Sequence, residues 1–135
     1  MDRLFLDANV LFSAAYREDA PLRRLWRLPR AELITSTYAL VEAERHLDAK
    51  QRARLVELTQ EEVEMVPDVP SGGFPPGVAL PDKDAPLLAA AIAARATHLI
   101  TGDRRHFGAH FGKQIGGVLI LPPRDYPMPP SEEEA

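Results

Sequence analysis

The stretch Leu99-Ile100-Thr101-Gly102-Asp103 runs from a short apolar segment through a hydroxyl and a glycine to a carboxylate. Near the start of the chain, Leu4-Phe5-Leu6-Asp7 also ends an apolar run on an acid. We interpret both stretches as buried strands whose ends carry an acidic side chain. A carboxylate beside an apolar strand end is costly to bury unless water, a cation or a hydrogen bond satisfies it. The two stretches therefore predict two strands and a polar site near their ends.

Candidate strands and helices alternate along the chain. Apolar runs predict strands at residues 3–7, 32–35, 63–66, 98–101 and 118–121. Helical spacing predicts helices at 9–16, 21–28 and 82–94, another from Ser36 or Thr37 through 47, and a stretch from 48 or 49 to 59 that either continues it or is separate. This alternation favours an α/β fold, a three-layer α/β/α sandwich around a mostly parallel sheet of four to five strands. Segment 82–94 is nearly apolar all round, so we expect that helix to be deeply buried.

The composition is that of one globular domain. The chain has 135 residues, of which 45% are hydrophobic and 27% charged. There is no cysteine, which excludes disulfides, a thiolate zinc site and a cysteine nucleophile. The chain has no signal-peptide pattern and no apolar run near the roughly 18 residues of a membrane span. We therefore expect a cytoplasmic protein with no membrane partner.

Two segments interrupt the alternation. Residues 67–81 are rich in proline and glycine and predict a loop, unusually long for a compact domain and of a kind that is often functional. From residue 122 the chain holds five prolines and three glutamates, and we expect the end of this tail to be disordered. We divide the chain into a domain at 1–121 and a Pro/Glu-rich tail at 122–135.

Four acids are placed where they can converge. Asp7 and Asp103 follow strands, Glu42 lies about two turns into the helix after the second strand, and Asp84 lies at the start of the helix after the third. In sheets of this class, ligands bind outside the carboxyl ends of the strands at the point where the strand order reverses. Four carboxylates there favour a shared hard cation, Mg²⁺ or Mn²⁺, and metal-assisted chemistry on phosphates.

Each acid taken alone has a structural alternative. Asp7 is a possible helix N-cap, and Asp103 after a glycine fits a plain turn. Glu44 competes with Glu42 for the inward face of its helix. Asp82 and Asp84 both suit the electropositive start of a helix, and we assign the metal role to Asp84 and a structural role to Asp82.

Basic side chains offer a route to nucleic acid although the net charge is −4. Ten of the sixteen lysines and arginines lie within residues 1–54, so the positive charge is concentrated. The densest cluster is either a solvated helix face or a phosphate-contacting surface; its members are Arg17, Arg23, Arg24, Arg27 and Arg30. The arginines that we predict to contact substrate are Arg23, Arg24 and Arg27, with Arg104 and Arg105 nearer the scissile phosphate.

Aromatic and imidazole side chains give weaker indications of a binding site. Trp26 and Tyr16 can stack on bases, but a tryptophan at apolar helical spacing is more often part of a core. The four histidines have no zinc-ligand spacing, and only His106 is near the predicted site.

Together the four acidic segments resemble a known family. They are Leu6-Asp7-Ala8-Asn9-Val10-Leu11, Leu40-Val41-Glu42-Ala43, the run from Asp82-Lys83-Asp84-Ala85 to Ala91, and Leu99-Ile100-Thr101-Gly102-Asp103-Arg104-Arg105-His106-Phe107. Their residues, order and spacing resemble the PIN-domain nucleases, which include the VapC-like toxin ribonucleases of bacterial and archaeal toxin–antitoxin pairs. The resemblance spans residues 3 to about 121.

The resemblance implies a function and a set of roles. Asp7, Glu42, Asp84 and Asp103 would hold one or two Mg²⁺ or Mn²⁺ ions, with Asn9 and Thr101 supporting the site. It implies an endoribonuclease acting on single-stranded or structured RNA, an antitoxin partner and a homodimer. Many members carry a further acid shortly after the position of Asp103, but here residues 104–107 hold none.

Other functions fit the sequence less well. A haloacid-dehalogenase-type phosphatase places a second aspartate two residues after the first, where this chain has Asn9. A response-regulator receiver needs an aspartate after its third strand and a lysine after its fifth, where this chain has Pro67 and Pro122. The remaining alternative is a catalytically inactive PIN-like domain that binds a partner or RNA.

Overall fold

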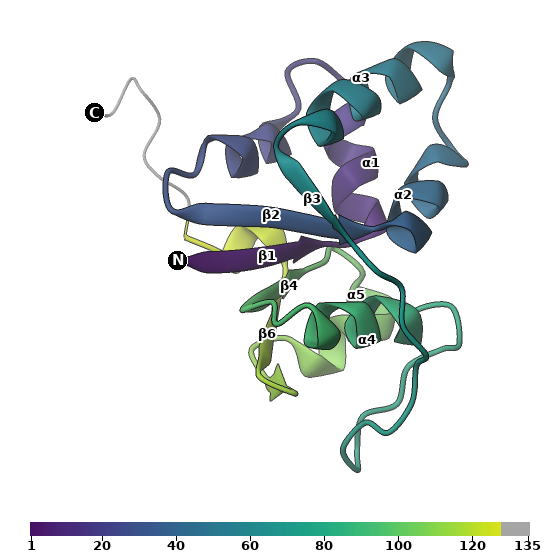
Figure 1. The fold of residues 1–135 in the computed structure, drawn as a ribbon, viewed down its shortest axis with the longest axis vertical. Coiled ribbons are helices and arrows are strands. Elements are labelled where there is room, and N and C mark those ends of the chain that lie inside the picture. Colours follow the sequence, from purple (N-terminus) through teal and green to yellow (C-terminus); the bar gives the residue numbers. More distant parts are fainter. Residues whose placement is uncertain (128–135) are drawn as a thin grey trace.

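Six strands form one sheet in the order β3-β2-β1-β4-β6-β5. The computed structural model describes residues 1–127, and the sheet is flanked by helices as predicted (Figure 1). All neighbouring strands are parallel except β5 and β6. The strands are β1 (Asp2–Leu6), β2 (Ala31–Ser36), β3 (Val63–Val66), β4 (His98–Ile100), β5 (Gln114–Ile115) and β6 (Val118–Leu121).

Strand β1 is at the centre of the core because its sequence suits burial on both faces. Leu4, Phe5 and Leu6 are fully buried, which is typical of a central parallel strand. Strand β1 pairs with β2 on one side and β4 on the other, with Leu6 opposite Ile100. This register brings the residues that follow β1 and β4 to the same edge of the sheet.

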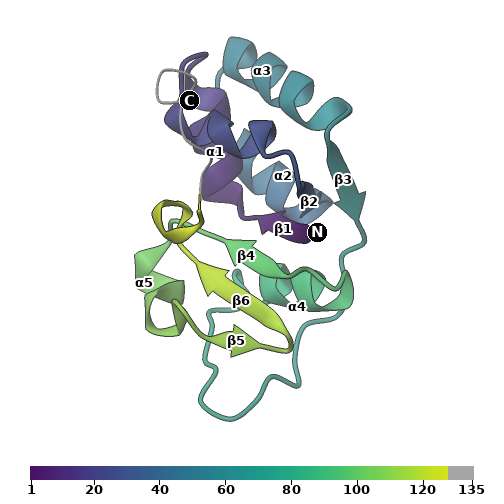
Figure 2. The same cartoon turned by 90° about the vertical axis from the view of Figure 1, so that its left-hand side faces the viewer.

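The helices lie in two groups. Figures 1 and 2 show α1, α2 and α3 gathered beside β2 and β3, and α4 and α5 beside β4 and β6. The deep burial expected for α4 is confirmed, since five consecutive residues from Leu87 to Ala91 are buried. The helices are α1 (Ala8–Tyr16), α2 (Thr37–Glu44), α3 (Ala49–Gln60), α4 (Ala85–Ala93) and α5 (Arg104–Phe107), with 3-10 turns η1 (Pro21–Arg27), η2 (Gly108–His110) and η3 (Pro123–Asp125).

The differences from the prediction concern element ends and short elements. Helix α2 ends at Glu44, and α3 is separate because Asp48 caps it through a reciprocal pair of hydrogen bonds with Gln51. Segment 21–27 is a 3-10 helix rather than an α-helix, and α4 begins at Ala85 rather than residue 82. The short elements α5, β5, η2 and η3 were not predicted.

The chain connectivity creates a switch point between β1 and β4. From β1 the chain moves outward to β2 and β3, and then crosses back over β1 to form β4. Ligand sites of open α/β sheets lie at such reversals, outside the carboxyl ends of the strands.

The last described residues pack on the sheet. The Tyr126 hydroxyl donates a hydrogen bond to the Asp2 carboxylate at 2.6 Å, and its ring meets His98 edge-on. The end of the tail, predicted to be disordered, lies outside the described residues. Within residues 1–127, no helix has the length and apolar character needed to span a membrane.

Candidate metal centre

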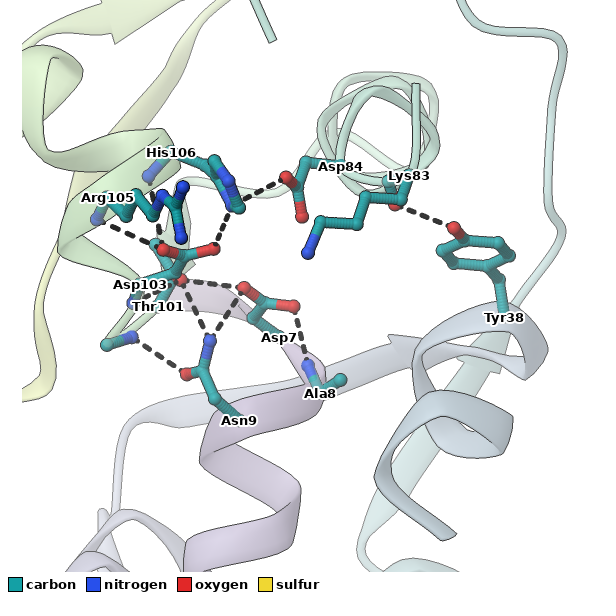
Figure 3. Close-up of polar contacts among 11 residues, drawn as sticks. Asp7, Ala8, Asn9, Tyr38, Lys83, Asp84, Thr101, Asp103, Arg105 and His106 are labelled. Atoms are coloured by element: carbon teal, nitrogen blue, oxygen red, sulfur yellow. Dashed lines mark hydrogen bonds and ion pairs between the residues drawn. The ribbon is translucent and has the colours of Figure 1, made fainter. Parts of the chain in front are cut away.

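A pocket of about 300 Å³ opens at the switch point, and all four predicted acids line it. We call it the carboxylate pocket. Its polar contacts come from the ends of β1 and β4 and the starts of α1, α4 and α5 (Figure 3). The lining residues are Asp7, Ala8, Asn9, Phe12, Tyr38, Glu42, Ala43, His46, Lys83, Asp84, Leu87 and Asp103.

Asp7 is the most buried acid of the pocket, with 3% of its surface exposed. It is the N-cap of α1, and its Oδ1 accepts a hydrogen bond from the Ala8 amide at 2.6 Å. Its Oδ2 accepts from the Thr101 hydroxyl at 2.6 Å and from Asn9 Nδ2 at 3.1 Å. Burial raises the pKa of Asp7 to about 6, although the hydrogen bonds from Thr101 and Ala8 oppose the rise.

Asn9 and Thr101 join the two strand ends. Asn9 Oδ1 accepts a hydrogen bond from the Gly102 amide at 2.8 Å, and its Nδ2 lies 3.3 Å from Thr101 Oγ1. Thr101 Oγ1 also accepts from the Asp103 amide at 3.1 Å. These contacts hold Asp7 and Asp103 at one edge of the sheet (Figure 3). The supporting roles that we predict for Asn9 and Thr101 require this arrangement.

Asp103 is both an N-cap and a wall of the pocket. Its Oδ1 accepts hydrogen bonds from the backbone amides of Arg105 and His106, both at 3.1 Å, and so begins α5. Its Oδ2 lies 2.8 Å from His106 Nδ1. One oxygen is thus used for the backbone, while the other joins the polar cluster.

Asp84 presents a buried oxygen that lacks a hydrogen bond. Its exposed fraction is 7%, and Oδ2 has no hydrogen-bond partner within the described chain. His106 Nδ1 lies 3.0 Å from this oxygen, but the hydrogen bond of Nδ1 is with Asp103. Burial raises the pKa of Asp84, the charge of His106 opposes the rise, and Asp103 adds to it.

The absence of a hydrogen bond to this oxygen bears on whether the pocket suits a cation. A buried carboxylate oxygen without a partner is costly, and a metal ion removes that cost. Asp84, Asp103 and His106 each offer a ligand atom, and these atoms lie within 4.8 Å of one another. The residues therefore fit a divalent cation.

Glu42 lies on the pocket face of α2, as predicted, while Glu44 is not among the lining residues. It is the most exposed of the four acids, with 34% of its side chain accessible, and Oε1 lies 2.9 Å from Arg45 Nη1. Any ligand role for Glu42 competes with this surface ion pair.

Two pocket residues were missed by sequence reasoning. His46 lines the pocket, so the expectation that His106 is the only histidine near the site is wrong. The missed signal was its position four residues after Glu42 in a segment that the sequence predicts to be helical through 47, although α2 ends at Glu44 and His46 follows in a turn. Lys83 extends its ammonium group toward the space between Asp7 and Asp84 (Figure 3). Its backbone oxygen accepts a hydrogen bond from the Tyr38 hydroxyl at 2.7 Å.

The five predicted arginines lie in three settings: two line a second hollow, one braces α1, and Arg27 and Arg105 are exposed outside that hollow. Arg24 and Arg104 line a second hollow of about 410 Å³ beside Gly102, together with Arg124, which was not predicted; we call it the arginine hollow, and its other lining residues are Pro21, Leu22, Pro122 and Pro123. Arg23, in contrast, donates from Nε to the Ala14 backbone oxygen at 3.0 Å and braces α1.

Trp26 also has a structural role. Its indole nitrogen donates to the Leu58 backbone oxygen at 2.7 Å, and its ring packs against the core. The structural alternative for this tryptophan is therefore the one that the fold supports.

The comparisons with known proteins agree with the predicted family. A family model described as PIN domain matches residues 3–105, and the chain belongs to the PIN domain family. No protein of curated function matches the chain.

Two solved structures have a similar fold. A chain in the crystal structure of VapBC2 from Rickettsia felis, bound to a DNA fragment from its promoter, is 14% identical at a TM-score of 0.62; the match covers 89% of this chain and 98% of that one. A chain in VapBC-1 from nontypeable Haemophilus influenzae is 17% identical at a TM-score of 0.55, covering 91% and 99%.

Proposed function

We propose that this PIN domain is a metal-dependent endoribonuclease that hydrolyses RNA phosphodiester bonds in the cytoplasm. The observation that carries the proposal is the buried Oδ2 of Asp84, which accepts no hydrogen bond and lies beside Asp103 and His106 at the switch point. Burial of this carboxylate is costly without a cation, which supports metal binding and with it the metal-dependent activity that we propose.

Asp7, Glu42, Asp84 and Asp103 are the residues that would hold one or two Mg²⁺ or Mn²⁺ ions. A bound divalent cation supplies a water of lowered pKa and neutralises charge on the phosphate. The pocket volume of about 300 Å³ leaves room for a phosphate beside the acids.

The side chains around the acids position the charges. Thr101 and Asn9 fix the Asp7 carboxylate, so that it need not reorganise when substrate arrives. Lys83 brings a positive charge into the same pocket, where it can contact a phosphate oxygen that the acids would otherwise repel.

The similar VapBC chains support a biological setting. We propose that the protein is the toxin of a toxin–antitoxin pair, that it forms a homodimer, and that an antitoxin protein binds it. Co-expression with the product of the adjacent gene, followed by co-purification, tests this assignment.

The experiment that tests the enzyme pairs each proposed ligand with a neighbour. We expect the purified protein to cleave single-stranded RNA with Mn²⁺ or Mg²⁺ and not with EDTA. Asp84→Asn should lower the rate by about 10²-fold or more, because each ligand charge is needed for metal binding, while Asp82→Asn changes it less than threefold. Glu42→Gln should likewise lower the cleavage rate more than Glu44→Gln does. Equal effects within each pair, or cleavage in EDTA, would contradict the proposed site.

The arginine hollow offers a second test. Counterion release predicts that RNA affinity falls with salt, by a slope of roughly 0.7 per phosphate contact on a single strand. Arg24→Ala combined with Arg104→Ala should reduce the slope by about 1.4. Lys50→Ala with Lys113→Ala removes equal charge at exposed positions outside the hollow and should leave the slope unchanged. Binding is measured in Ca²⁺ across a salt series. Equal slopes in the two double variants would show that the hollow does not contact RNA phosphates.

A further inference from the structure

We propose that His106 is a metal ligand through Nδ1, and that this nitrogen makes the centre favour Mn²⁺ and later transition metals over Mg²⁺. The inference rests on the proposed metal-dependent function and deepens it by assigning the ligand that determines metal choice. Its starting point is the position of one imidazole between two carboxylates of the carboxylate pocket.

The first observation is the spacing of the ligand atoms. His106 Nδ1 lies 2.8 Å from an Asp103 oxygen and 3.0 Å from Asp84 Oδ2. Neighbouring ligand atoms of an octahedral cation bound at 2.0–2.1 Å are separated by about 2.9 Å. The imidazole nitrogen is therefore spaced from each carboxylate as one ligand of an ion is from the next, and the ligand atoms of all three residues lie within 4.8 Å of one another (Figure 3).

The second observation is that one hydrogen on Nδ1 cannot satisfy both acids. Its hydrogen bond is with Asp103, and Asp84 Oδ2 has none, although that oxygen is buried. A cation among the three atoms would satisfy both carboxylates at once. Nδ1 is free to coordinate in the neutral tautomer that carries its hydrogen on Nε2.

The chemical consequence concerns metal preference. Mg²⁺ takes oxygen ligands and retains its waters, whereas first-row transition metals accept imidazole, with an affinity that is lowest for Mn²⁺ and rises toward Cu²⁺. Residues 104–107 hold no further acid. The side chain in this segment that can serve as a ligand close to Asp103 is the His106 imidazole. Replacement of an oxygen ligand by this nitrogen lowers the affinity for Mg²⁺ relative to Mn²⁺.

The test uses the full chain loaded with Mn²⁺. Pulsed electron paramagnetic resonance detects a ¹⁴N nucleus bound directly to Mn²⁺ by its echo modulation, a signal independent of RNA cleavage. We expect this modulation in the parent, its loss in His106→Gln, and its retention in His46→Gln, which removes the histidine that lines the carboxylate pocket. By calorimetry, His106→Gln should weaken Mn²⁺ binding by about 10- to 100-fold and Mg²⁺ binding by less than about threefold.

The outcomes separate this inference from the proposed function. Mn²⁺ that binds the parent without nitrogen modulation overturns the role of His106 and leaves the metal-dependent nuclease intact. If the signal is lost in His46→Gln but not in His106→Gln, the bound nitrogen belongs to His46. That result also overturns the role of His106. No binding of either ion refutes both. The parent spectrum requires no substitution, so the absence of nitrogen modulation overturns the role of His106 even where a variant folds poorly.

Discussion

Asp7→Asn is expected to reduce RNA cleavage at least about 10³-fold while making the metal-free protein more stable at neutral pH. The loss of activity follows from its place in the pocket, where it is the proposed ligand with the lowest exposure. The gain in stability follows from the same burial. The Asp7 carboxylate, which we propose to serve catalysis, therefore lowers the stability of the folded protein.

The magnitude and sign come from the shifted pKa. Burial raises the pKa of Asp7 from 3.8 to about 6, a change that corresponds to roughly 3 kcal/mol. Below pH 4 both folded and unfolded chains carry the proton, and there is no penalty. As the pH rises from 4 to 6, the unfolded chain loses its proton first, so the folded state becomes relatively less stable. The full penalty is present above pH 6.

Asparagine removes the charge but not every interaction. The Asp7 carboxylate accepts hydrogen bonds from Ala8, Thr101 and Asn9, and an amide offers only one acceptor oxygen to these donors. We therefore expect a net gain of about 1–2 kcal/mol at pH 7 rather than the whole penalty.

The measurement is thermal unfolding in EDTA at pH 4 and pH 7, together with an RNA cleavage assay. The difference between variant and parent should be largest at pH 7 and shrink toward pH 4. The exposed Asp19→Asn serves as the matched control and should change neither quantity. A variant that is less stable than the parent at pH 7, or that cleaves RNA at the parent's rate, would contradict the assignment of Asp7.

The strand ends were predictable because their signal is local. Apolar runs closed by Asp7 and by Gly102-Asp103 indicate strand, turn and acid together, and the parallel register then brings the two acids to one edge. Strand β5 has two residues and α5 has four, which is too short for either periodicity to be detected. The start of α4 was ambiguous because Asp82 and Asp84 are equally good start signals.

The rest of the site depends on tertiary packing. Lys83 and Asp84 are sequence neighbours, yet one is exposed and the other is buried against His106. The arginine hollow combines residues from η1, from the turn after β4 and the start of α5, and from η3 with the residue before it, segments far apart in the sequence. No local pattern indicates that Arg24, Arg104 and Arg124 meet. For His106, the sequence places the imidazole near Asp103 but does not place it beside Asp84.

Saturating Mn²⁺ is expected to reverse the loss of stability that the metal-free protein undergoes as Asp7 and Asp84 ionise with rising pH. Burial raises the pKa of both Asp7 and Asp84, so without metal the protein loses stability as these acids ionise. A cation binds the ionised forms and competes with protons. At 100 times its dissociation constant, the ion should stabilise the fold by about 2.7 kcal/mol, or about 10 °C in Tm.

This stabilisation should be large at pH 7 and shrink toward pH 4, because the raised pKa values of Asp7 and Asp84 let protons compete with the cation as the pH falls. Melting curves with Mn²⁺ and with EDTA, each at both pH values, measure it. Asp84→Asn should abolish most of the metal-induced shift because it removes the buried ligand oxygen, whereas Asp82→Asn, at an exposed position two residues earlier, should retain it. If Mn²⁺ raises Tm equally in both variants, or equally at pH 4 and pH 7, the ion binds somewhere other than the carboxylate pocket.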